Sequence, residues 1–144
     1  VQADRCDVLR YYHAAASSGR SIQALAGMER SRLDLLKILR IGRETSIRGT
    51  GIPLQEAIAL SHYKDLRRSF MPTDLIPLIE ANPAFILDWA QYSEDKRTKG
   101  GSYLLESGEL GELASGVRLQ FPSMQSAVAN YVVRELDFWA GAAG

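Results

Sequence analysis

The segment from Tyr92 to Gly101 constrains the fold more than any other part of the chain. It carries five charged residues in the six positions from Glu94 to Lys99, and two glycines follow them. Burying these neighbouring charges together would cost more desolvation energy than their mutual attraction returns. The segment is therefore predicted to be an exposed polar connection on a compact scaffold, where binding residues are often found.

The sequence before this segment has the periodicity of helices, and so does the end of the chain. Ser21 is a typical helix N-cap, Pro53 suits a first helical turn, and Gly42 and Gly141 are typical of helix ends. Apolar residues recur at helical spacing in six places, namely residues 4–17, 22–41, 54–70, 75–79, 85–89 and 124–140.

The part that follows the charged segment reads as a hairpin. Strands are predicted at Ser102–Glu106 and Val117–Phe121, and the glycine-rich sequence between them leaves room for a third short strand. The predicted fold is one domain, residues 1–144, of the α+β class and predominantly α. It consists of about five or six helices with a small antiparallel β-hairpin packed on the C-terminal helix.

Length and cysteine content place few demands on the environment. A chain of 144 residues can bury a core without disulfides, and its single cysteine, Cys6, favours a reducing compartment. No apolar run is long enough to span a membrane, and the first residues do not read as a signal peptide. A cytoplasmic protein without a membrane partner is predicted.

The zero net charge hides an asymmetry between the two halves of the chain. Residues 1–70 carry 12 basic against 7 acidic residues, whereas residues 71–144 carry 5 against 10. The two halves can attract each other in the folded state, or they can present a basic and an acidic face to a partner. Attraction between the halves is the favoured interpretation, because surface charge segregates by chance in short chains.

One loop is a candidate anion site. The sequence from Arg48 to Gly51 precedes a predicted helix, and the amide groups of a helix N-terminus attract anions. A small enzyme or ligand-binding domain would use this loop together with His62 or with carboxylates. The loop follows a helix and lacks the residues of a phosphate-binding loop, which favours a turn that satisfies its own backbone.

No catalytic set, cofactor site or metal site is predicted. His13 and His62 have no second ligand at helical spacing, and Cys6 has no histidine nearby in the sequence. Paired carboxylates can act as acid and base, but the acidic residues of the C-terminal part are predicted to be solvated. These residues are Glu106, Glu109, Glu112, Glu135 and Asp137.

A basic face over residues 30–48 is the feature that would suit a nucleic-acid-binding regulator. Six basic residues there stand against Asp34 and Glu44. The stretch has no aromatic residue for base stacking, and the chain as a whole is neutral. No nucleic-acid partner is expected.

Two stretches resemble a known group of proteins. They read Trp89-Ala-Gln-Tyr-Ser-Glu-Asp-Lys-Arg-Thr-Lys-Gly-Gly-Ser-Tyr103 and Phe121-Pro-Ser-Met-Gln-Ser-Ala-Val-Ala-Asn-Tyr-Val-Val-Arg-Glu-Leu-Asp137, with a glycine-rich hairpin between them. This succession resembles the C-terminal part of small bacterial toxin-immunity proteins and covers about a third of the chain. The resemblance implies a cytoplasmic inhibitor that binds one toxin domain and has no catalysis of its own.

The leading hypothesis is a non-enzymatic protein-binding module, in particular an immunity-type inhibitor. The acidic half would attract a basic nuclease toxin by electrostatic steering. The residues predicted to contact the partner are Glu94, Asp95, Lys96, Arg97, Glu109 and Glu112.

Overall fold

The computed structural model describes residues 22–45, 51–96 and 100–141, with side chains from residue 31 onward. The predicted helix at 4–17, His13, Cys6, most of the Arg48–Gly51 loop and Arg97 lie outside these residues. The chain forms two compact units, residues 1–36 and 37–144. The described part of the first unit is helical.

Helix α2 (Ile22–Thr45) does not end at Gly42 as the sequence predicted. It continues to Thr45, whose hydroxyl donates to the Ile41 carbonyl at 2.8 Å and so satisfies one of the last helical acceptors. Gly42 has another role, because a Cβ atom there would lie 2.7 Å from the Trp89 ring. The glycine allows the indole to lie directly on the helix backbone.

The predicted third helix is broken in the structure. It divides into α3 (Leu54–Leu60), α4 (Tyr63–Leu66) and the 3₁₀ turn η1 (Arg67–Ser69). The break falls at His62, which adopts the left-handed backbone conformation with φ 57°. A single left-handed residue redirects the chain and cannot continue a right-handed helix.

Two shorter helical segments follow, in agreement with the predicted pair. The turn η2 (Pro72–Leu75) leads into α5 (Ile76–Ala81), and α6 (Ala84–Asp95) begins after Pro83. Helix α6 runs further than predicted, into the charged segment. No helix in the described part of the chain is long and apolar enough to cross a membrane.

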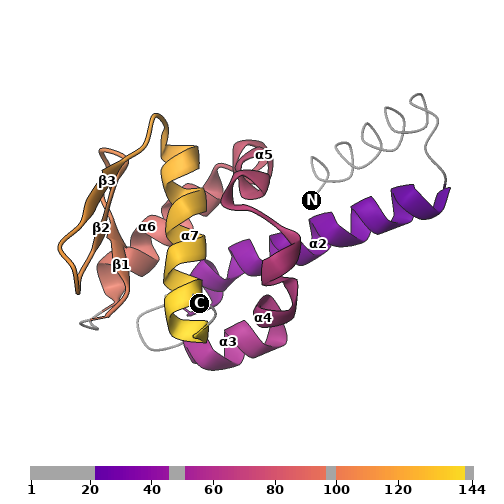
Figure 1. Cartoon of the computed structure of the whole chain (residues 1–144), viewed down its shortest axis with the longest axis horizontal. Coiled ribbons are helices and arrows are strands. Elements are labelled where there is room, and N and C mark those ends of the chain that lie inside the picture. Colours follow the sequence, from indigo (N-terminus) through magenta and orange to yellow (C-terminus); the bar gives the residue numbers. More distant parts are fainter. Residues whose placement is uncertain (1–21, 46–50, 97–99, 142–144) are drawn as a thin grey trace. The chain divides into compact units, whose positions relative to one another are not determined.

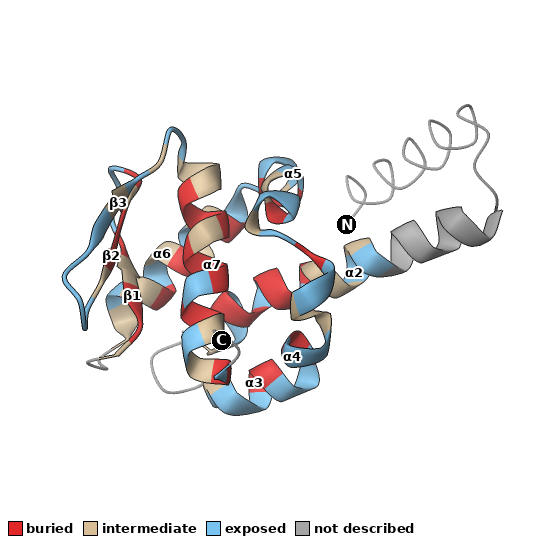
Figure 2. Cartoon of the chain, viewed as in Figure 1, coloured by how far each residue is buried: buried red, intermediate tan, exposed pale blue. Residues whose placement is uncertain are grey.

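The last helix, α7 (Met124–Ala140), is the central element of the second unit (Figure 1). Ser123 caps it by accepting from the Ser126 amide, and Gly141 ends it with φ 66°, as predicted. Its side chains pack against η2, α5, α6 and the sheet. Tyr131 and Leu136 are fully buried, and buried positions recur along the helix (Figure 2).

The predicted hairpin is a three-stranded antiparallel sheet in the order β1-β2-β3. The additional strand, β2, lies in the glycine-rich sequence where a third short strand was possible. The strands are β1 (Ser102–Leu104), β2 (Glu109–Glu112) and β3 (Arg118–Gln120). The register pairs Ser102 with Glu112, so both side chains lie on the face toward α7. The described residues are mostly helical and the sheet packs on α7, which confirms the predicted α+β class.

Trp89 joins α6 to α2 in the core. Its side chain is fully buried, its Nε1 donates to the Leu39 carbonyl at 2.8 Å, and its ring meets those of Tyr92 and Tyr131. Because an indole N–H is costly to bury without an acceptor, this contact fixes where α6 crosses α2.

We therefore expect Gly42→Ala to destabilise the protein by about 1–3 kcal/mol, because the added methyl group overpacks against Trp89. The sign is informative, since the same change inside an ordinary helix stabilises by about 0.5–1 kcal/mol. Urea denaturation measures the difference, with Arg40→Ala at an exposed site of α2 as the control. A Gly42→Ala protein more stable than the wild type would contradict the close packing of these two residues.

Candidate functional site

A buried carboxylate lies where α6, α7 and the sheet meet. Glu135 is fully buried and accepts hydrogen bonds on both oxygens. Its Oε1 accepts from the Ser102 amide at 2.9 Å, and its Oε2 accepts from Tyr92 Oη at 2.8 Å and Trp139 Nε1 at 2.9 Å. Lys96 Nζ donates to both oxygens, at 2.7 and 2.6 Å.

These donors make the burial of the charge possible. An isolated carboxylate would be expensive to desolvate, whereas this one has a cation and three neutral donors. Burial raises the pKa of Tyr92, and the charge of Glu135 adds to the rise, so Tyr92 keeps its proton and donates. Burial lowers the pKa of Lys96, while its hydrogen bond to Glu135 opposes that shift.

Only a glycine fits at position 101 in this arrangement. Its backbone is left-handed, with φ 80°, and a Cβ atom there would collide with the Glu135 carboxylate and lie 2.8 Å from Lys96 Nζ. Lys96 also donates to the Ser102 carbonyl at 2.7 Å. Lys96 thus links the end of α6 to the start of β1 and to α7.

The predicted exposure of the charged segment is wrong for Lys96. Its side chain is 8% exposed, whereas Glu94 is exposed as predicted and Asp95 is half-buried. The prediction treated four adjacent charges as a unit. Because α6 extends to Asp95, successive side chains point in different directions, and Lys96 comes to the same side as Tyr92, one helical turn earlier.

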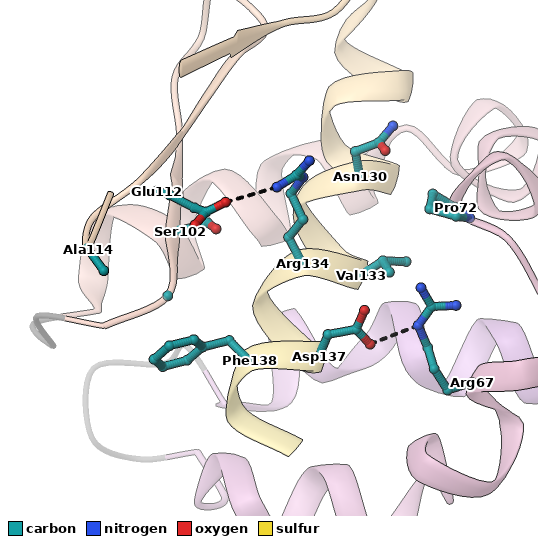
Figure 3. Close-up of a pocket in the computed structure, with 11 residues that line it drawn as sticks. Arg67, Pro72, Ser102, Glu112, Ala114, Asn130, Val133, Arg134, Asp137 and Phe138 are labelled. Atoms are coloured by element: carbon teal, nitrogen blue, oxygen red, sulfur yellow. Dashed lines mark hydrogen bonds and ion pairs between the residues drawn. The ribbon is translucent and has the colours of Figure 1, made fainter. Parts of the chain in front are cut away.

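A groove of about 410 Å³ crosses the outer face of α7 beside this cluster (Figure 3). The helix forms its floor, the end of the sheet forms one wall, and the η1–η2 segment forms the other. Its lining includes Asn130, Val133, Arg134, Asp137 and Phe138 of α7, Ser102, Glu112 and Ala114 of the sheet side, and Arg67 and Pro72 opposite.

Two ion pairs hold the charged side chains of this groove. Arg67 Nε donates to Asp137 Oδ1 at 2.8 Å, and Tyr63 Oη donates to the same oxygen at 2.6 Å. Arg134 Nη1 donates to Glu112 Oε2 at 3.1 Å. Burial raises the pKa of Tyr63, and Asp137 adds to the rise, so the phenol remains a donor.

The structure brings together only some of the residues predicted to bind a partner. Ser102 connects Lys96 with Glu112. Its carbonyl accepts a hydrogen bond from Lys96, and its backbone pairs with that of Glu112 across the sheet. Glu109 lies on the opposite face of β2 from Glu112, 3.6 Å from Arg118.

The predicted solvation of the C-terminal acidic residues is wrong for Asp137, whose side chain is 14% exposed, and most clearly for Glu135, which is fully buried. The signal was its position inside the apolar stripe of the last helix, between Val132 and Leu136. A charged residue at such a position requires partners, and Tyr92 and Lys96 supply them from one face of α6.

Comparison of the chain with protein-family models, curated proteins and solved structures gave no match. Among the described residues, no group of three or more His, Cys, Asp or Glu side chains is placed to hold a metal ion. His62, the histidine within the described range, has a mostly exposed side chain 4.0 Å from Asp65.

Removal of the Lys96 charge should expose the cost of burying Glu135. We expect Lys96→Met to destabilise the protein by about 3–5 kcal/mol, because it leaves the carboxylate without its counter-ion. Lys64→Met, at an exposed site of α4, is the matched control and should stay within about 0.5 kcal/mol of the wild type. Equal free energies of unfolding for the two variants would show that the ion pair is not required.

Proposed function

We propose that this protein is a non-enzymatic protein-binding module and, more narrowly, an immunity-type inhibitor of a bacterial toxin domain. Its contact surface is the solvent side of α6, here called the α6 face. The face consists of Ala84, Leu87, Asp88, Gln91, Glu94 and Asp95, which follow one another at helical spacing.

The observation that carries the proposal is the exposure of Leu87. This side chain is 73% exposed, more than any other large hydrophobic side chain in the described residues. Its neighbours on the face are Ala84 one turn before it, Asp88 beside it and Gln91 one turn further on. An apolar residue surrounded by a polar rim is the composition of a protein interface.

Charge supports a basic partner. Glu94 is exposed on the α6 face, Asp88 and Asp95 are half-buried there with Asp95 Oδ2 buried, and the exposed Glu80 precedes them on α5. Burial raises the pKa of Asp88, while Arg43 nearby opposes the rise. A surface with charges of one sign associates faster with a protein of the opposite charge. A basic nuclease toxin would be such a protein.

This surface keeps part of the contact set predicted from the sequence and revises the rest. Glu94 and Asp95 remain. Lys96 is withdrawn because Glu135 holds it inside the fold. Glu109 and Glu112 lie on the sheet, where each is paired with an arginine.

The test begins with the neighbouring gene. A toxin encoded directly upstream supplies the probe, namely its C-terminal toxic domain, in a growth-rescue assay and in direct binding by calorimetry. We expect Leu87→Ser to weaken binding by about tenfold or more, as loss of a central interface residue does. Leu60→Ser is the matched control, since Leu60 is 63% exposed on α3, outside the proposed surface.

A charge variant tests the electrostatic part separately. Glu94→Lys should slow association and weaken its dependence on salt, whereas Glu106→Lys, on the turn after β1, should change association less. Both should leave the free energy of unfolding within about 0.5 kcal/mol of the wild type. Full binding by the Leu87 and Glu94 variants would remove the α6 face from the proposal, and a wild-type chain that neither binds nor neutralises the toxin domain would overturn the inhibitor function.

A further inference from the structure

The groove over α7 has the size and lining of a ligand site, and it is separate from the α6 face. Its volume of about 410 Å³ falls within the roughly 300–1,000 Å³ of small-molecule sites. Such sites combine apolar walls with a few fixed polar groups. Here Val133, Pro72 and Phe138 supply the apolar part, and two arginines supply the polar part (Figure 3).

The hydrogen-bond donors of the groove are only partly used. A guanidinium group has five N–H donors. Arg67 uses two of them, toward Asp137 and the Phe70 carbonyl, and Arg134 uses one, toward Glu112. The remaining donors have no acceptor among the described residues.

Three of the four carboxylate oxygens of the groove accept hydrogen bonds from the described residues, and Asp137 Oδ2 is the one that does not. Asp137 Oδ1 accepts from both Tyr63 and Arg67. Each oxygen of Glu112 accepts one bond, from Arg134 and from Ser115. The groove therefore has a surplus of donors, and a ligand that brings acceptor oxygens completes it.

Both arginines are held in place before any ligand arrives. Arg67 is fixed by Asp137, by the Phe70 carbonyl at 3.2 Å and by the Phe70 ring, whose centroid is 5.5 Å from its guanidinium carbon. Arg134 is held by Glu112. A donor that is already oriented loses less conformational entropy on binding than a free side chain does.

The net charge of the groove determines which kind of anion it would bind. Arg67 and Arg134 face the groove together with Asp137 and Glu112, so its formal charge is zero. A doubly charged phosphate would be repelled by both carboxylates, whereas a single planar carboxylate matches the fork of a guanidinium and adds only one charge.

Phe138 indicates what the carboxylate is attached to. Its side chain is 49% exposed at the edge of the groove, and its ring is fixed edge-on against Trp139 at 4.9 Å. An exposed ring held in one orientation offers a stacking surface for an aromatic or branched apolar group.

We propose that the groove over α7 binds an organic carboxylate carried next to an aromatic or branched apolar group. Arg134 binds the carboxylate, and Phe138, one helical turn further along α7, contacts the apolar group. A free small acid and the C-terminal residue of a peptide present this same chemistry.

The proposal is tested by titrating the ¹⁵N-labelled full chain with 3-phenylpropionate and following amide chemical shifts. We expect saturable shifts at Ser102, Asn130 and Val133, with a Kd on the order of 1 mM. The neutral amide 3-phenylpropanamide and inorganic phosphate should each bind at least about tenfold more weakly, because one lacks the charge and the other carries too much. A tripeptide ending in phenylalanine separates the two sources, since binding tighter than that of the free acid assigns the ligand to a protein terminus.

Variants locate the site. Arg134→Gln should weaken binding of 3-phenylpropionate by about tenfold, the loss typical of a charged hydrogen bond. Arg118→Gln is the matched control, because Arg118 is also an exposed arginine paired with a glutamate, but on the outer side of the sheet. Phe138→Ala, at a partly exposed position, provides a second variant that should bind more weakly while remaining folded.

Three results would overturn the proposal. These are the absence of saturable shifts, equal binding of the acid and the amide, and binding that Arg118→Gln weakens as much as Arg134→Gln does. Neither arginine variant touches the α6 face, so both should retain any binding of the toxin domain, and the two proposals can fail independently.

Discussion

The buried charge of Glu135 is the constraint on which the second unit depends. A carboxylate at a fully buried position of α7 is stable only if donors come to it from other elements. Tyr92 and Lys96 come from the end of α6, and the Ser102 amide comes from β1. Because these three groups converge on two oxygen atoms, the end of α6, the start of the sheet and the middle of α7 are fixed relative to one another. Apolar packing alone is non-directional and would tolerate small shifts between them.

This arrangement also builds the groove. Residues of α7 that follow one another point to different sides, so Glu135 faces inward while Arg134 and Phe138 face outward. Ser102 is bound to Glu135 on one side and pairs with Glu112 in the sheet, which places Glu112 within reach of Arg134. The wall of the groove is therefore positioned by the same carboxylate that lies beneath its floor. The residues that line the groove are therefore positioned by the packing of the core beneath them.

The sequence predicted the structural elements that depend on residues close to one another in the chain. Ser123, Gly141 and the apolar spacing between them specify α7 locally, and the glycine-rich turns specify the sheet. The burial of Lys96 could not be predicted in this way, because its partner lies 39 positions away in the sequence. The same holds for Gly42, which reads as a helix end until Trp89 is known to lie against it. The groove depends on Arg67 meeting Asp137 across 70 positions, and no local pattern records that contact.

The pairing of charges bears on the two interpretations of the acidic half. Glu109, Glu112 and Glu135 pair with Arg118, Arg134 and Lys96, and all of these bases belong to the same half of the chain. Pairing inside the half uses acids and bases in equal number, so it leaves the acidic surplus unchanged. Asp137 with Arg67 is a pair that joins the two halves and reduces the surplus by one charge. Arg43 of the basic half lies near Asp88 of α6, so a second carboxylate of the surplus has a basic neighbour from the other half. The described residues thus show attraction between the halves at two places, whereas Glu80 and Glu94 are exposed.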